Sequence, residues 1–149
     1  MKHINLLVLL VVLCSACSQA TGTPPVISTP TGKSRSEALQ LGQPVQLRGG
    51  EQATTQDKQI TVKFDALLED SRCPKSVVCV WSGQARVRLL VSTGSSQPEP
   101  IELSTLPSKD QGTVQGLDIR LEAVDPYPIT PDQETAFEVY TITLVITQR

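Results

Sequence analysis

Residues 60–69 read ITVKFDALLE, and apolar side chains occupy every second position of this stretch. Successive side chains of a β-strand point to opposite faces of the sheet, so such alternation is typical of a strand with one face on a core and one in water. The pattern therefore predicts a half-buried strand. Its core-facing positions are expected to be Ile60, Val62, Phe64, Ala66 and Leu68.

Three further stretches repeat this period of two, namely residues 85–92, 117–124 and 140–147. Each predicts another half-buried strand. The positions expected to face the core are Ala85, Val87, Leu89, Val91, Leu117, Ile119, Leu121, Ala123, Tyr140, Ile142, Leu144 and Ile146. Shorter candidate strands are Val45–Leu47, Gln52–Thr55 and Ile101–Ser104.

The segments between these strands carry the residues that tight turns favour. Turns are predicted at Gly49-Gly50, at Asp57-Lys58, over residues 93–96 and at Gly112. Six or seven antiparallel strands within residues 44–149 predict an all-β domain. The expected architecture is an antiparallel β-sandwich (Ig-like) or a small barrel.

The composition narrows the classes of function. The chain has 149 residues, a length that suits one domain. Its only His is His3 and its only Met is Met1, so removal of the N-terminus would exclude histidine triads, histidine metal sites and methionine copper sites. A net charge of −2 argues against binding to nucleic acid or to an anionic membrane, which requires a basic face.

The N-terminal residues differ from the rest of the chain. Residues 1–16 predict a signal peptide, because a short basic start precedes the apolar run of residues 4–13 and small residues follow it. That run is shorter than the roughly 20 residues that a membrane-spanning helix needs. Residues 17–43 are rich in Ser, Thr, Gly, Pro and Gln, a composition that predicts a flexible tether.

Residues 14–17, Cys-Ser-Ala-Cys, resemble a bacterial lipobox. The resemblance implies cleavage after Ala16 and acylation of Cys17, although Cys14 stands where a lipobox usually has Leu or another aliphatic residue. Ser18 stands where Asp would resemble an inner-membrane retention signal. The predicted location in a Gram-negative cell is therefore the outer membrane, facing the periplasm. The alternatives are a soluble secreted protein and, without an outer membrane, the outer face of the cytoplasmic membrane.

The two remaining cysteines, Cys73 and Cys79, form an even pair in an oxidising compartment, which predicts a disulfide. A metal or redox site that combines them with Glu69 and Asp70 is disfavoured. Their spacing is not the C-x2-C spacing of zinc or thioredoxin-like sites, and no His completes the ligand set. The sequence predicts no metal and no cofactor.

Residues 69–83 read EDSRCPKSVVCVWSG and interrupt the alternation around them. The motif DSRCP followed by CVW and a glycine resembles one found in uncharacterised bacterial envelope lipoproteins. The segment GLDIRLEAVDPYP at residues 116–128, before a last strand containing Tyr140, extends the resemblance over most of residues 59–147. The resemblance marks a family and implies no activity.

The first interpretation of residues 69–83 is structural. The predicted disulfide then staples a turn, and Trp81 covers the disulfide and the edge of the core. Arg72 is expected to pair with Glu69 or Asp70. Small exported domains often need such staples, because their cores bury little surface.

The second interpretation is partner binding. A rigid disulfide loop would present Arg72, Lys75 and Trp81, which are residue types common at binding hot spots. Tyr127, in the Asp-Pro-Tyr-Pro turn at residues 125–128, is a further candidate contact, although it could also be a packed loop residue.

An enzymatic interpretation has little support in the sequence. Glu69 and Asp70 are consecutive, so on a strand they would point to opposite faces, which is poor geometry for paired acid–base work. No catalytic residue is therefore predicted. The dipeptide Lys75-Ser76 inside the predicted disulfide loop vaguely resembles the reactive site of a trypsin inhibitor.

The sequence thus predicts a lipid-anchored, non-enzymatic envelope protein with a structural or partner-binding β domain. Its expected contacts are the membrane, through the N-terminal lipid, and an envelope protein, with no nucleic acid. The alternative is a secreted protease inhibitor or a hydrolase whose site the sequence does not show.

Overall fold

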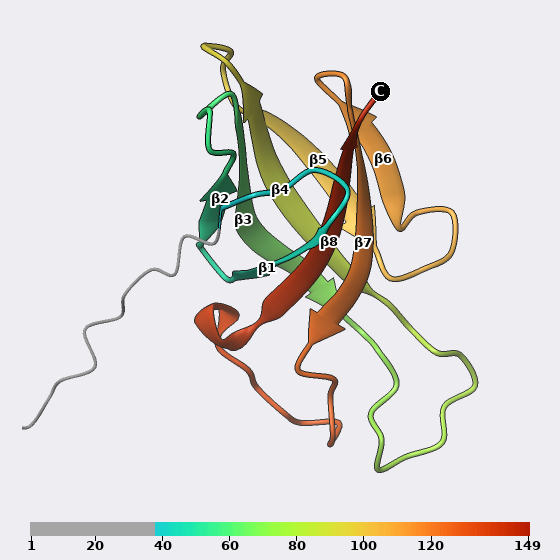
Figure 1. Ribbon diagram of the computed structural model, residues 1–149. Coiled ribbons are helices and arrows are strands. Elements are labelled where there is room, and N and C mark those ends of the chain that lie inside the picture. The colour runs from blue at the N-terminus through green and yellow to red at the C-terminus, as the bar shows by residue number, and fades with distance from the viewer. Residues whose placement is uncertain (1–37) are drawn as a thin grey trace, which may run out of the picture. The chain divides into compact units, whose positions relative to one another are not determined.

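Eight strands form two antiparallel sheets in the computed structural model, which describes residues 38–149 (Figure 1). The strands are β1 (Pro44–Arg48), β2 (Gln52–Thr54), β3 (Ile60–Asp70), β4 (Ala85–Thr93), β5 (Glu99–Ser104), β6 (Gln111–Val114), β7 (Leu117–Asp125) and β8 (Thr141–Gln148). A single short 3-10 helix, η1 (Phe137–Val139), precedes β8. No helix within these residues is long and apolar enough to cross a membrane.

The two sheets are stacked as a sandwich and are not joined into a closed barrel, so the predicted β-sandwich is confirmed. The described residues form eight strands rather than the predicted six or seven, because β6 was not predicted. One sheet has the order β1-β8-β7-β6 and the other has the order β2-β3-β4-β5. Strands that are consecutive in sequence are neighbours within each sheet, except that β1 lies beside β8. This order differs from the Greek-key order of immunoglobulin domains, where strands exchange between sheets.

The core lies between the sheets and is made by the alternating apolar positions. Ile60, Val62 and Phe64 of β3 are buried, as predicted, and so are the predicted positions of β4 and β8. The largest fully buried side chains are Val62, Phe64, Val87, Leu89, Val91 and Leu103 from one sheet and Leu117, Ile119, Ile142, Leu144 and Ile146 from the other. Removal of this apolar surface from water is the main force that holds the sheets together.

Register shifts in β3 and β7 overturn part of the predicted alternation. In β3, Ala66 and Leu68 were expected to face the core, yet Leu67 packs against it instead. In β7, Val124 is buried where Ala123 was expected. A bulge inserts one extra residue into a strand, and because the side-chain period is two, the side chains that follow change face until the next shift; β3 has two such shifts and β7 has one.

The chain also has a strand where a turn was predicted. Gly112 lies inside β6, paired with Ile119 of β7. A Cβ atom at Gly112 would lie 2.8 Å from the Cδ1 atom of Ile101, a residue of β5 in the other sheet. The glycine therefore permits close approach of the two sheets, rather than a reversal of the chain.

The packed domain begins ahead of the predicted boundary at Pro44. Leu39 is only 2% exposed, and its amide donates a hydrogen bond to the carbonyl oxygen of Thr54 at 3.1 Å. Leu39 also forms a parallel bridge with Thr55. The predicted signal peptide, Cys17 and most of the predicted tether fall within residues 1–37, outside the described part of the chain.

Candidate functional site

Two loops lie together at one end of the sandwich, the 71–84 loop between β3 and β4 and the 126–136 loop between β7 and η1 (Figure 1). Two backbone hydrogen bonds join them. The amide of Lys75 donates to the carbonyl oxygen of Pro128 at 3.1 Å, and the amide of Ser76 donates to that of Ile129 at 3.0 Å. Each loop therefore supports the other.

The base of the 71–84 loop continues the hairpin of β3 and β4. The amide of Ser71 donates to the carbonyl oxygen of Gln84, and the amide of Cys73 donates to that of Ser82, both at 2.8 Å. Gly83 has a φ of +66°, and a Cβ atom there would lie 1.7 Å from the carbonyl oxygen of Ser71. Only glycine fits this position, because any side chain would push the two sides of the hairpin apart.

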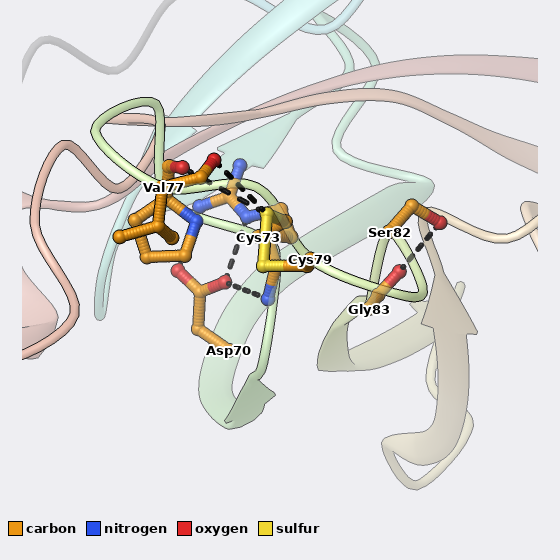
Figure 2. Close-up of a disulfide and its surroundings, with 8 residues drawn as sticks. Asp70, Cys73, Val77, Cys79, Ser82 and Gly83 are labelled. Carbon is orange, nitrogen blue, oxygen red and sulfur yellow. Dashed lines mark hydrogen bonds and ion pairs between the residues drawn. A yellow bond between two sulfur atoms is a disulfide. The ribbon is translucent and has the colours of Figure 1, made fainter.

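The predicted disulfide is present and closes the outer part of this loop. Cys73 and Cys79 are bonded, with their Cα atoms 5.9 Å apart (Figure 2). A covalent link across so few residues removes conformations that the loop could otherwise adopt. The disulfide and the hairpin base together restrict the conformations that the outer residues of the loop can adopt.

Arg72 is buried beneath the loop and joins the two sheets. It is only 7% exposed, and its Nε and Nη2 atoms each donate to one carboxylate oxygen of Asp70 at 2.7 Å. Its Nη1 atom donates to the carbonyl oxygen of Val124, and its Nη2 atom donates to that of Pro126 at 2.8 Å. The planar guanidinium fork suits such a bidentate pair.

The prediction that Arg72 is an exposed contact residue was therefore wrong. Its donors are taken up by Asp70 and by carbonyl oxygens at the end of β7. The structural interpretation, in which Arg72 pairs with a neighbouring carboxylate, is confirmed for Asp70.

Asp70 is held in its charged form by this arrangement. Burial by itself raises the pKa of the Asp70 carboxyl. The hydrogen bonds and positive charge of Arg72, together with a 3.1 Å hydrogen bond from the Tyr140 hydroxyl, outweigh burial and lower that pKa below its ordinary value. Burial and the charge of Asp70 in turn raise the pKa of Tyr140.

Glu69 has a separate set of partners. Its carboxylate accepts hydrogen bonds from the Ser71 hydroxyl at 2.7 Å and the Gln84 side chain at 3.3 Å, and it pairs with Arg86 at 3.0 Å. The Ser71 hydrogen bond, aided by the charge of Arg86, lowers the pKa of Glu69. Glu69 and Asp70 share none of these partners, so each carboxylate is held by its own set of contacts.

Lys75 and Tyr127, both predicted contact residues, lie against each other. The Nζ atom of Lys75 is 5.6 Å from the centre of the Tyr127 ring, and the Cζ atom of Arg72 is 4.9 Å from it. These distances suit cation–π attraction. Tyr127 is about one-third exposed and therefore links the buried guanidinium to the surface beside Lys75.

The outermost part of the 71–84 loop is apolar and exposed to solvent. Val78 is 102% exposed, Val80 is 97% exposed and Trp81 is 83% exposed, with Val77 less exposed beside them. We call these four residues the apolar tip. The expectation that Trp81 covers the disulfide and the core edge was wrong, because its side chain lies almost wholly in solvent.

Val78 and Val80 were not identified from the sequence as contact residues. The signal that could have found them is local, since both are apolar residues between a disulfide cysteine and the next strand, where loops are usually polar. Ile129 of the facing loop is also exposed, and its carbonyl oxygen accepts the hydrogen bond from the Ser76 amide.

The cavity between the two loops is small. It holds about 70 Å³ and is lined by Asp70, Arg72, Tyr140 and the prolines of both loops. Ligand pockets usually hold about 300 Å³ or more, so this cavity suits ordered water rather than a substrate. Among residues 38–149, no group of three or more His, Cys, Asp or Glu side chains is placed to bind a metal ion.

No known protein family, no curated protein and no solved structure matches the chain. The resemblance of residues 69–83 to uncharacterised envelope lipoproteins therefore stays a prediction. The exposed apolar tip, held by the disulfide and by the buried Arg72, is the feature of the described residues that most requires a functional explanation.

Replacement of Asp70 by Asn should destabilise the domain by about 3 kcal/mol, because it leaves the buried Arg72 charge without a counter-ion. The pKa of Asp70 is lower in the folded chain, so its stabilisation is fully present above the unfolded value of about 4 and is lost as the pH falls through the folded value. Urea denaturation at neutral and acidic pH should show that the free energy of unfolding falls less on acidification in the variant than in the unsubstituted protein.

Asp65→Asn is the matched control for Asp70→Asn. Asp65 pairs with Arg88 at 2.7 Å, but the Arg88 side chain is 40% exposed, so the substitution should cost less than about 1 kcal/mol. Equal losses for the two variants would contradict the structural role assigned to Asp70.

Gly83→Ala should destabilise the domain by about 2 kcal/mol or more beyond Gly116→Ala. Both glycines have a positive φ, which an L side chain adopts at a cost of about 1 to 2 kcal/mol. A Cβ atom at Gly116 meets nothing within 4 Å, whereas one at Gly83 meets the Ser71 carbonyl. Similar midpoints in thermal denaturation would show that the base of the hairpin is not tightly closed.

Proposed function

We propose that the protein is a lipid-anchored component of the bacterial cell envelope. Its β domain is a non-enzymatic binding module that contacts another envelope component through the apolar tip. The observation that carries this proposal is the nearly complete exposure of Val78, Val80 and Trp81 on a loop that a disulfide closes. A side chain that remains in water without packing gains stability only when a partner covers it.

The support for the anchor comes from the N-terminal sequence. A basic start, an apolar run and the Cys-Ser-Ala-Cys sequence of residues 14–17 together fit a lipoprotein signal. The disulfide between Cys73 and Cys79 is compatible with an oxidising compartment outside the cytoplasm. In a Gram-negative cell, Ser18 after the acylated Cys17 favours the outer membrane.

The rigidity of the loop supports a binding function. The disulfide, the hairpin base and the two hydrogen bonds to the 126–136 loop fix the backbone that carries the apolar tip. A loop that is already ordered loses little conformational entropy when a partner binds. Trp81 adds a large apolar surface of the kind that dominates binding energy at interfaces.

The alternatives receive less support from the geometry. A protease inhibitor must present the backbone of its reactive segment to the enzyme as an added strand. The amides of Lys75 and Ser76 already donate to Pro128 and Ile129. A hydrolase receives less support because Glu69 and Asp70 are both engaged in hydrogen bonds with side chains of the 71–84 loop, Glu69 with Ser71 and Asp70 with Arg72.

Labelled palmitate should be incorporated into the protein when it is made in a bacterial host, and Cys17→Ser should abolish the label. Acylation at Cys17 is the physical basis of the proposed anchor, because multiple acyl chains are needed for stable attachment. The measurement is autoradiography of the immunoprecipitated protein from the membrane fraction. Label that persists in Cys17→Ser would refute acylation at this residue.

A photo-crosslinking amino acid in place of Val80 should form adducts in the native envelope, and the same amino acid in place of Leu41 should form far fewer. Leu41 is 38% exposed but lies away from the tip, near Gly94 and Gln115. Trp81→Ala should reduce the Val80 adducts by about tenfold or more, because it removes much of the buried area. Equal adducts at both positions would show that the tip is not the contact surface.

A further inference from the structure

We propose that the apolar tip inserts into the interfacial region of a zwitterionic phospholipid bilayer. This inference rests on the proposed function and deepens it, because it identifies the envelope component that covers the tip as the membrane itself. The domain would then touch the membrane at a second point besides its N-terminal lipid, which would fix the orientation of the sandwich relative to the bilayer.

The shape of the tip favours a bilayer. Val78 and Val80 are almost fully exposed, so no neighbouring residue forms a rim or wall around them. The tip is therefore a protrusion at the end of a hairpin loop, as the light green loop in Figure 1 shows. A protruding apolar loop can enter a fluid bilayer without a preformed complementary groove.

The composition of the tip fits the membrane interface. Residues 73–83 read CPKSVVCVWSG and contain one charged side chain, Lys75, with no acidic side chain. Trp is enriched where membrane meets water, because its ring is apolar while its N–H remains hydrated. The aliphatic stem of Lys75 can lie along the apolar surface while its ammonium group stays in the headgroup layer.

The charge of the rest of the molecule excludes a mainly electrostatic attraction. The net charge is −2, and the facing loop carries the exposed acidic residues Asp132 and Glu134. Attraction to anionic lipids requires a basic patch, and one lysine does not provide it. Burial of the apolar side chains must therefore drive insertion of the tip. This driving force does not require anionic lipids, so a zwitterionic bilayer is sufficient.

The backbone limits how deeply the tip can enter. Within residues 38–149, no backbone hydrogen bond satisfies the amides of Val78, Val80 or Trp81. Unpaired amides cannot enter the hydrocarbon core without a large penalty, so they must remain in the hydrated interface. The expected depth is that of the boundary between headgroups and acyl chains.

Trp81 is the only tryptophan of the chain, so its fluorescence reports the position of the tip directly. The full-length protein would be reconstituted into phosphatidylcholine vesicles whose acyl chains carry bromine either near the headgroup or near the chain end. Quenching should be strong with bromine near the headgroup and weak with bromine near the chain end. It should change little between low and high salt, because apolar burial is not screened.

Val80→Asp tests the apolar tip itself. A charged side chain at this position should abolish the quenching by headgroup-proximal bromine, because the tip can no longer leave water. Leu41→Asp is the matched control, since it places the same charge on an exposed apolar residue outside the tip, and it should leave the quenching unchanged. Blocked thiols at Cys73 and Cys79 in both variants would show that the loop is intact.

The outcomes separate this inference from the proposed function. Insertion of the tip would be overturned if neither brominated lipid quenched Trp81. It would also be overturned if Val80→Asp were quenched as strongly as the unsubstituted protein. If quenching is absent and the Val80 crosslinks in the envelope join a protein, the proposed function holds with a protein groove as the occupant. If quenching is absent and the Val80 crosslinks do not exceed those at Leu41, both proposals fail.

Discussion

A single guanidinium group ties the two sheets together at the end of the sandwich that carries both loops. Arg72 follows β3 of one sheet, yet its donors reach the carbonyl oxygens of Val124 and Pro126 at the end of β7 in the other. A buried charge that lost these partners would be strongly destabilising, so the bonds fix where the two strands end relative to each other. The 71–84 loop begins beside Arg72 and the 126–136 loop begins at Pro126. Arg72 therefore sets where both loops begin, and the disulfide and the hydrogen bonds between the loops act on the residues beyond it.

Most of the fold follows from the period of two in the sequence, because a half-buried strand needs that alternation. The departures have local physical causes. Ala66 and Ala123 are displaced from the core by register shifts, and at each shift an adjacent apolar residue, Leu67 or Val124, takes the core-facing place. Where apolar residues are adjacent, the alternation alone does not decide which of them faces the core. Gly112 suggested a turn, although its lack of a side chain serves close contact with Ile101. Leu39 is buried within a segment whose composition otherwise predicts a tether.

The candidate site was predictable in its covalent chemistry but not in its exposure. The predicted compartment and the number of cysteines sufficed to predict the pairing of Cys73 with Cys79, because an even pair outside the cytoplasm is normally oxidised. The burial of Arg72 depends on carbonyl oxygens that lie more than fifty positions further along the chain, as the separations of 52 and 54 residues show. No pattern near Arg72 reveals those partners. The exposure of Trp81 likewise depends on distant residues, since the core is made by side chains of other segments and does not include Trp81. The sequence next to Trp81 does not reveal this.

The position of β8 also sets the order in which the sandwich can assemble. Among the strands of residues 38–149, β1 comes first in the sequence and its neighbour β8 comes last. The β2-β3-β4-β5 sheet pairs only strands that are consecutive in sequence, and such local pairings favour early formation. β1 therefore remains without a neighbour, and with its ladder groups open to aggregation, until the carboxy-terminal residues are available. Since β8 pairs with both β1 and β7, a truncation that removed only β8 would leave β1 without a partner, while β7 would remain paired with β6.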